Sequence, residues 1–227
     1  MSERTNDRPS PAADGSVSGG RDSVEDWLAQ RLVDTCPATP PQGVLRVLRV
    51  LGRWDRLAYE AVAGMSTPLL DEPMRLVARV ADRSKPWLAT AAVLAVVGGP
   101  TGRRAALAGV AAIGATSFVV NQPMKRAGSR RRPDRRDLRV PVPRWVPMPT
   151  STSFPSGHSA SAVAFAVAVG KVLPQARVPL RVAAATVAFS RVYTGVHYPG
   201  DVIVGAATGA VIGRLTSRLV RRVTEPR

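Results

Sequence analysis

The sequence predicts an all-α protein in which an interfacial amphipathic helix precedes a membrane helix bundle of about five spans, with six as the alternative. Polar and apolar residues are segregated along the chain: 1–40 and 125–147 are polar, whereas much of 87–121 and 156–220 is rich in Ala, Val, Gly and Leu. In addition, the apolar positions that begin at Val44 repeat with a helical period. These two observations together predict the fold class.

Residues 1–42 predict a disordered or weakly helical hydrophilic tail, because Ser, Gly, Asp, Arg and Pro mix there without an apolar run. Residues 23–33 are compatible with a short helix, and the tail lacks the apolar core of a signal peptide. The single Cys36 excludes an intramolecular disulfide and a cysteine metal site. Because His158 and His197 are the only histidines, a His-rich zinc site is not expected either.

Residues 43–82 predict amphipathic interfacial helices. Apolar residues occupy positions 44, 47, 48, 51, 54, 58 and 62, and the opposite face carries Arg46, Arg49, Arg53, Arg56 and Glu60. A basic amphipathic helix with a Trp at its boundary is typical of a membrane interface. A helix packed on a soluble core would show the same stripe and stays as an alternative. Residues 69–80 repeat the pattern but carry too many charges to cross a bilayer alone.

Residues 83–220 predict a membrane-embedded core, followed by a basic C-terminal tail at 221–227. The candidate spans are 87–99, 105–120, 159–172, 182–196 and 202–212. None reaches the roughly 18 to 20 uninterrupted apolar residues of an obvious spanning helix. Each stretch reaches that length only if its Ser, Thr and Gly residues and a flanking Arg are counted. Small residues are expected where membrane helices pack closely. A soluble all-helical protein is the alternative that these stretches leave open.

The formal net charge of +16 comes almost entirely from arginine. Such an excess suits phosphate, anionic lipid or nucleic acid as a partner, and arginine favours bidentate phosphate contacts. A GC-rich genome combined with membrane-flanking arginines would explain the same bias. The charge alone therefore does not select a partner.

One chemically informative segment is Pro155-Ser156-Gly157-His158. Ser and Pro before an apolar run predict a helix start with Ser153 or Phe154 near the cap position. Unpaired N–H groups and the helix dipole favour an anion there, and Gly157 has no side chain to block it. His158 would stand at the edge of that site with a proton for a leaving group. Taken alone, the segment favours a capped helix whose His is simply satisfied over an anion site.

A second segment places Lys125 and Arg132 seven residues apart, near two helical turns, with Pro133 closing the element. Two cations at this spacing can grip one phosphate from two sides. A charge run is, however, usually a solvated, membrane-flanking or nucleic-acid-binding loop. The pattern does not say which of the neighbouring arginines matter, namely Arg126, Arg130, Arg131, Arg135, Arg136, Arg139 and Arg144.

In a third segment, His197 and Asp201 lie four residues apart, which on a helical turn lets the carboxylate reach an imidazole nitrogen and set its tautomer. A surface His–Asp pair is the alternative. Arg191 ends an apolar span, where an unpaired charge is expensive and a bound phosphate would pair it. Together the three segments supply a nucleophile, an acid and cations, as phosphoryl transfer requires. The arginines and the lysine can take the electrostatic role of a metal.

In this order the three segments resemble the signature of the type 2 phosphatidic acid phosphatase family, or lipid phosphate phosphatases, of the acid phosphatase/vanadium haloperoxidase superfamily. Its pattern is K-x6-R-P, P-S-G-H and S-R-x5-H-x3-D, matched here by Lys125/Arg132-Pro133, Pro155–His158 and Ser190-Arg191/His197/Asp201. The resemblance covers about 87–214. It implies that His197 is the nucleophile that forms a phosphohistidine, that Asp201 orients it, and that His158 protonates the leaving oxygen. It further implies that the phosphate is bound by Lys125, Arg132, Ser156, Gly157 and Arg191, without cofactor or metal.

The expected function is that of an integral-membrane phosphatase acting on a phosphate monoester of an isoprenoid or glycerolipid. The alternatives are a polyprenyl diphosphate phosphatase that recycles a cell-wall carrier, and, from another class, a basic non-catalytic membrane-surface or nucleic-acid-binding protein. The arginine-rich stretch has no interleaved aromatic residue before Trp145, so lipid phosphate and bilayer are the expected partners and nucleic acid is not. The sequence does not indicate the oligomeric state.

A multi-pass location in the plasma membrane follows from the five spans. An odd number of crossings puts the hydrophilic N-terminal tail on the same side as the three motifs. Residues 125–144 hold nine Lys or Arg against two Asp, which predicts an active site that faces the cytoplasm. Basic turns at Arg103-Arg104 and Arg177/Arg181 oppose this orientation, and a sixth span within 57–80 would reverse it.

Overall fold

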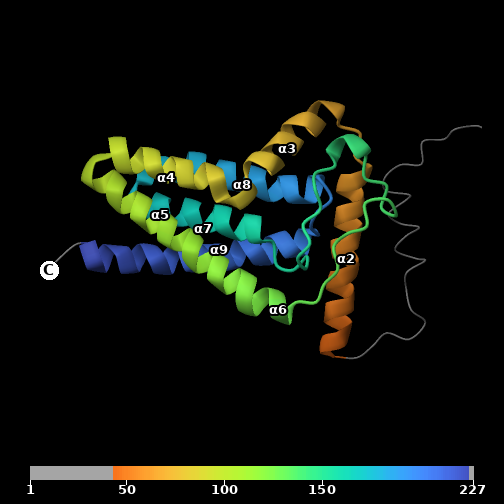
Figure 1. Cartoon of the computed structure of the whole chain (residues 1–227). Helices are drawn as coiled ribbons and strands as arrows, with labels where there is room; N and C mark the ends of the chain where they lie inside the picture. Colours follow the sequence, from red (N-terminus) through yellow and green to blue (C-terminus); the bar gives the residue numbers. More distant parts are fainter. Residues whose placement is uncertain (1–42, 225–227) are drawn as a thin grey trace, which may run out of the picture. The chain divides into compact units, whose positions relative to one another are not determined.

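The structure, a computed structural model, describes residues 43–224, and every regular element in that range is helical. Expectations for the tail at 1–42, with its short helix at 23–33, and for 225–227 lie outside the described residues. The larger helices are α2 (Val44–Gly64), α3 (Pro68–Val80), α4 (Lys85–Val97), α5 (Gly99–Val119), α7 (Gly157–Val172), α8 (Arg177–Tyr193) and α9 (Pro199–Thr224) (Figure 1). The all-α prediction is confirmed.

Shorter helical turns connect these helices. A π-helical turn over Val120–Met124 joins α5 to α6 (Lys125–Ala127), and 3-10 turns occupy Asp82–Ser84, Val142–Arg144 and Pro174–Ala176. All five apolar stretches that we interpreted as candidate spans fall largely within α4, α5, α7, α8 and α9. Residues 221–224, which we assigned to the basic C-terminal tail, continue α9 as helix.

Helix α7 is the centre of the bundle and packs against α5, α8 and α9. Ala160, Ala162, Ala164 and Ala168 are all completely buried, although they point in different directions around the helix. A helix that is apolar on all sides belongs in the middle of an assembly. The Ala-rich composition of this stretch therefore reflects its central position.

Helix α9 approaches α7 so closely that three of its contact positions are glycine, at 205, 209 and 213. A Cβ atom at Gly209 would lie 2.1 Å from the carbonyl oxygen of Ala160, and one at Gly205 would lie 2.4 Å from that of Ser156. Small residues spaced four apart let membrane helices pack backbone to backbone. This packing also fixes the start of α7 against the start of α9, where two of the motifs lie.

The outer surface of the bundle is apolar, which is the reverse of a soluble protein. Val96, Val97, Phe118 and Ile203 are 79%, 75%, 70% and 66% exposed, whereas the interior is built from small residues. Large exposed apolar surfaces mark contacts with a partner or a membrane. By length and composition, Gly99–Ala127 and Pro199–Thr224 are able to cross a bilayer. At 13, 16 and 17 residues, α4, α7 and α8 are shorter.

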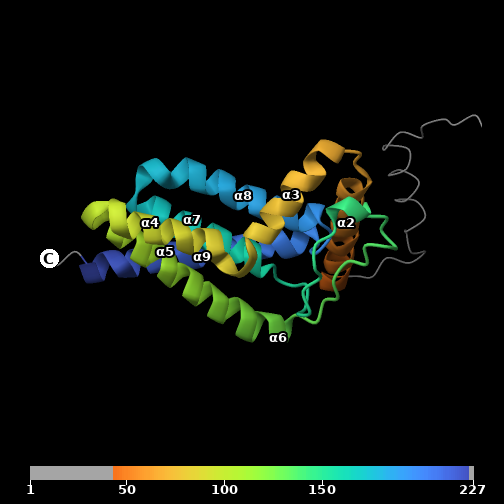
Figure 2. The same ribbon diagram turned by 45° about the horizontal axis from the view of Figure 1, so that its top comes forward.

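Helix α2 runs crosswise at one end of the bundle (Figures 1 and 2). Val47, Leu48, Leu51 and Trp54 on its apolar stripe are 57–59% exposed. Among residues 43–224, the second half of the helix, which includes Tyr59 and Ala63, provides the residues packed in the core. The exposed half of the stripe is therefore not packed on a core within residues 43–224, and it is available to a membrane interface.

The Arg144 side chain connects α2 and α3 to the bundle through hydrogen bonds and an ion pair. Its side chain is almost fully buried, stacks over the Tyr193 ring at 4.3 Å and forms an ion pair with Asp71 at 2.7 Å. The guanidinium also donates to carbonyl oxygens in and just after the last turn of α2, those of Val62, Ala63 and Met65. It thus satisfies carbonyls that a helix end leaves without partners.

We expect Arg144→Ala to destabilise the protein by about 3–5 kcal/mol, because it leaves the Asp71 carboxylate and several helix-end carbonyls without their buried partner. Thermal unfolding in a mild detergent measures the effect. Arg139→Ala is the matched control, since Arg139 lies in the same loop and its side chain is exposed. An unchanged unfolding temperature for Arg144→Ala would contradict this role.

Candidate active site

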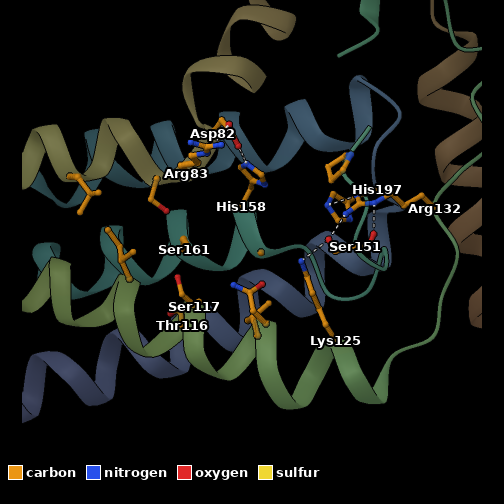
Figure 3. Close-up of a pocket in the computed structure, with 17 residues that line it drawn as sticks. Asp82, Arg83, Thr116, Ser117, Lys125, Arg132, Ser151, His158, Ser161 and His197 are labelled. Carbon is orange, nitrogen blue, oxygen red and sulfur yellow. Dashed lines mark hydrogen bonds and ion pairs between the residues drawn. The ribbon is translucent and has the colours of Figure 1, made fainter. Parts of the chain in front are cut away.

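The three motif segments meet at the end of the bundle where α2 lies, around a cavity of about 320 Å³ (Figure 3). Five of the eight site residues expected from the sequence line this cavity: Lys125, Arg132, Gly157, His158 and His197. They come from α6, the loop after it, the start of α7 and the loop between α8 and α9. The other three, Ser156, Arg191 and Asp201, lie in the layer behind it.

His197 is held in the loop that links α8 to α9. Gly195 in this loop has φ +72°, and the Tyr59 hydroxyl donates to its carbonyl oxygen at 3.3 Å. The imidazole is 2% exposed, with Nδ1 3.6 Å from Oδ2 of Asp201 and Nε2 3.2 Å from a guanidinium nitrogen of Arg132. Because arginine only donates hydrogen bonds, Nε2 must be the acceptor and Nδ1 must carry the proton. In this tautomer the Nε2 lone pair points at the Arg132 guanidinium, and both side chains line the cavity.

The Asp201 carboxylate is completely buried, and both of its oxygens accept hydrogen bonds. One oxygen accepts hydrogen bonds from the Ser153 hydroxyl and from the Tyr198 N–H at 3.0 Å, and the other accepts from Arg130 at 3.1 Å. Burial lowers the pKa of His197, and the charges of Arg132 and Arg191 act in the same direction, while Asp201 opposes them. His197 is therefore neutral at pH 7, as a nucleophile must be.

Arg130 connects this carboxylate to helix α2. One of its guanidinium nitrogens lies 2.6 Å from Asp55 and 3.1 Å from Asp201, and the guanidinium stacks on the Tyr198 ring at 3.9 Å. Asp55 also accepts from the Gly200 N–H at 2.6 Å. The sequence did not single out either residue, although Asp55 interrupts the basic face of α2. Asp55 and Arg130 are positioning residues, because they reach the imidazole only through Asp201.

We expect Asp55→Asn to lower kcat by about 10- to 100-fold with little change in KM. Without the Asp55 charge, Arg130 pairs with Asp201 alone. The stronger pairing competes with the interaction between the Asp201 carboxylate and His197. Steady-state kinetics on a lipid phosphate measures the effect, with Glu60→Gln on the same helix as the control. A KM increase at constant kcat would show instead that Asp55 acts on substrate binding.

Lys125 and Arg132 converge on the hydroxyl of Ser151, at 3.0 Å and 3.2 Å. Their spacing does not arise from two helical turns, as expected, since α6 ends at Ala127 and Arg132 lies in an irregular segment. Backbone carbonyls fix Arg132 instead, those of Ser151 and Val196 both at 2.8 Å. Two cations thus face one polar point, as a phosphate group requires. Ser151 carries no motif signal in the sequence.

Helix α7 begins two or three residues later than its sequence suggests. Ser156 is the N-cap, not Ser153 or Phe154, and its hydroxyl accepts from the Ser159 N–H at 3.4 Å. The Ser153 hydroxyl instead donates a hydrogen bond to the Asp201 carboxylate. The corrected cap leaves Gly157 and His158 in the first turn, on the cavity wall. The open helix N-terminus therefore points at the same space as the two cations.

Arg191 is 3% exposed and donates to the carbonyl oxygen of Ala78 at 2.7 Å. Its Nε atom has no hydrogen-bond partner within residues 43–224. The arginine thus lies at the back of the site, where its charge acts on the two histidines without lining the cavity. Ser156 is likewise fully buried, behind Gly157.

The 3-10 turn after α3 covers His158 from the opposite side. Asp82 Oδ1 is 3.5 Å from His158 Nε2, and Asp82, Arg83 and Ser84 all line the cavity (Figure 3). Arg83 and Ser84 adopt left-handed φ values of 51° and 58°, a strained conformation that is common at functional sites. This carboxylate was not predicted, because nothing in the sequence links residue 82 to residue 158.

The sequence and the fold of this chain are similar to those of known proteins. The family model described as the PAP2 superfamily matches residues 105–225. Decaprenylphosphoryl-5-phosphoribose phosphatase of Mycobacterium tuberculosis is 38% identical over 134 residues, which are 57% of this chain and 68% of that protein. Lipid A 1-phosphatase of Rhizobium johnstonii is 43% identical over 70 residues, 31% and 29% of the two chains.

A crystal structure described as the first transmembrane PAP2 type phosphatidylglycerolphosphate phosphatase from Bacillus subtilis has the same fold, with a TM-score of 0.61. The two chains are 21% identical over 90% of this chain and 98% of that one. The family model covers more than half of the sequence, and it includes all the motif residues described above. The chain therefore belongs to the PAP2 superfamily, among its membrane-associated phosphatases.

Proposed function

We propose that this protein hydrolyses a phosphate monoester of an isoprenoid or glycerolipid through a phosphohistidine intermediate and without a metal ion. The observation that carries the proposal is one cavity lined by two histidines, Lys125 and Arg132. The names of the two relatives describe phosphatases that act on a phosphate carried by a lipid. Both the apolar exterior of the bundle and the exposed stripe of α2 fit a substrate held in a bilayer.

In the proposed reaction, Nε2 of His197 attacks the phosphorus atom while the bond between phosphorus and the lipid oxygen breaks. His158 gives its proton to the departing oxygen, and Lys125 and Arg132 neutralise the equatorial oxygens. His158 then takes a proton from a water molecule whose oxygen attacks the phosphorus atom, and the bond between phosphorus and Nε2 breaks. Phosphate leaves, and His197 returns to its neutral form with Asp201 still at Nδ1.

A panel of lipid phosphates, assayed with purified protein in detergent and EDTA, tests the proposal. We expect release of phosphate that EDTA does not prevent and that vanadate inhibits. Loss of turnover in EDTA, restored by a divalent cation, would contradict the metal-independent mechanism. Absence of turnover with every lipid phosphate would contradict the function itself.

A lipid diphosphate is the second candidate substrate. Arg83 lines the same cavity as Lys125 and Arg132, so a third cation is available to a second phosphate group. Assaying a polyprenyl diphosphate beside the corresponding monophosphate separates the two. A non-catalytic basic surface is less well supported, because Arg130, Arg132, Arg135 and Arg144 form hydrogen bonds or ion pairs inside the structure.

We also propose that the chain crosses the plasma membrane several times with its active site toward the cytoplasm. The exposed arginines of α6 and of the loop after it support this orientation, among them Arg126, Arg131, Arg136 and Arg139. The test places a single cysteine at Asp137 in a Cys36→Ser background. Labelling of intact cells by a membrane-impermeant maleimide would show that the site faces outward instead.

A further inference from the structure

The active-site cavity has a polar wall that the proposed reaction does not use. We propose that this wall is a subsite for the hydroxyl groups of a sugar, so that the scissile phosphate is carried by a lipid-linked sugar and not directly by a lipid alcohol. The inference rests on the proposed phosphatase function and narrows its substrate. The wall lies between α5 and α7, next to the phosphate-binding residues (Figure 3).

The polar groups form a continuous stripe that leads to the phosphate site. On α5 and the π-helical turn after it, the cavity is lined by Ile113, Thr116, Ser117, Val120 and Asn121, a spacing that keeps them on one helix face. Lys125 continues this face one turn later. Asn121 therefore lies roughly 6 Å and Ser117 roughly 12 Å before Lys125 along the helix. A ring attached to the bound phosphate would lie beside these groups.

Helix α7 presents the opposing side of the same wall. Ser161 lines the cavity one turn after His158 and Gly157. In the close-up, Ser161 faces Thr116 and Ser117 across the cavity, with His158 and Lys125 toward the catalytic end (Figure 3). The group that receives the proton from His158 would thus be the one that contacts these side chains.

The hydroxyls of this wall differ from other hydroxyls in the bundle because they form no hydrogen bond to the described part of the protein. Thr90, Thr186 and Thr216 each donate to the carbonyl oxygen four residues earlier, as Ser and Thr in apolar helices usually do. Within residues 43–224, no hydrogen bond is formed by the side chains of Thr116, Ser117, Asn121 or Ser161. Thr116 Oγ1 is also completely buried without a partner.

Of these four residues, Thr116 and Ser161 are buried, Ser117 is half-buried and Asn121 is exposed. An unpaired polar group is costly where it is buried in an apolar bundle, since most buried polar atoms are hydrogen-bonded. An alkyl or prenyl chain would leave them unpaired, and an apolar wall would hold it better. A sugar ring offers several hydroxyls that both donate and accept, together with apolar faces suited to Leu88, Ile113 and Val120, which line the same cavity. A site built to bind hydroxyls rejects an analogue that lacks them.

Two synthetic substrates test the subsite: decyl riboside 5-phosphate and its 2,3-dideoxy analogue. Both are phosphate esters of a primary alcohol with the same chain, so they differ only in the two hydroxyls. We expect the wild type to prefer the riboside in kcat/KM. Ser117→Ala and Ser161→Ala should each reduce that preference by about 3- to 10-fold, the worth of one hydrogen bond. Because each ratio comes from one preparation, it does not depend on the folded fraction.

Ser217→Ala is the matched control, since the Ser217 hydroxyl is bonded to the Arg214 carbonyl oxygen away from the cavity. It should keep the wild-type preference. Equal kcat/KM values for the two substrates in the wild type would overturn the proposal, and so would an unchanged preference in both serine variants. If the wild type hydrolyses neither compound nor dodecyl phosphate, the proposed phosphatase function is itself wrong.

Discussion

His197→Ala is expected to reduce hydrolysis of a lipid phosphate by on the order of 10⁴-fold or more, because removal of a nucleophile from a unit of cooperating groups costs this much in other hydrolases. The imidazole is 2% exposed and is oriented by Asp201 on one side and Arg132 on the other. No other imidazole except His158 exists in the chain to replace it. Phosphate release by the purified variant in detergent measures the effect.

The control for this experiment must show that the variant is folded, since His197 is buried. Thermal unfolding of the variant in detergent serves this purpose. Thr186→Val, on the outer part of α8, is the matched substitution that should leave turnover unaffected. Undiminished phosphate release by a folded His197→Ala protein would rule out the phosphohistidine mechanism. Incorporation of acid-labile phosphate into the wild type but not into this variant would locate the intermediate.

His158→Ala is expected to lower turnover of an alkyl phosphate by about 10²- to 10⁴-fold, the usual contribution of a general acid. With p-nitrophenyl phosphate the first step should be almost unaffected, because p-nitrophenolate leaves without a proton. The second step still needs His158 as a base for water. We therefore expect a burst of p-nitrophenol followed by a slow steady state, measured by stopped-flow absorbance.

Asp82→Asn should show the same dependence on the leaving group to a smaller degree, because Asp82 only orients His158 across 3.5 Å. Asp137→Asn, an exposed carboxylate in the arginine-rich loop, is the matched control. Absence of the p-nitrophenol burst in His158→Ala, which would mean that the first step is slowed equally with both leaving groups, would contradict its assignment as the acid. Such a result would indicate a role in phosphate binding instead.

Much of the fold could be predicted, because it depends on local patterns. The five apolar stretches and the amphipathic stripe that begins at Val44 correspond to helices in the structure. The helix start at the second motif was wrong by a few residues, since Ser156 is the cap. Ser153 has equally good capping chemistry, and only its contact with Asp201 shows why it is used elsewhere.

The candidate site was less predictable outside its motifs. Lys125 and Arg132 were expected to share a helix, but the chain leaves the helix after Ala127 and Arg132 is fixed by the backbone around Ser151. Among the clustered arginines, Arg130 and Arg144 became distinct only through their contacts with Asp55 and Asp71. Side chains of one type carry the same local signal whether they pair internally or face solvent.

The sequence by itself determined the helical class, the order of the apolar segments and the residue types of a phosphoryl-transfer site, because periodicity and motif spacing are local properties. The tertiary structure alone decided that Asp82 faces His158, that Asp55 supports Asp201 through Arg130, and that Ser117 and Ser161 share one cavity wall. These contacts join residues far apart in the chain. The glycines on α9 and the small residues on α7 let these two helices pack closely, which brings the starts of α7 and α9 together at the site.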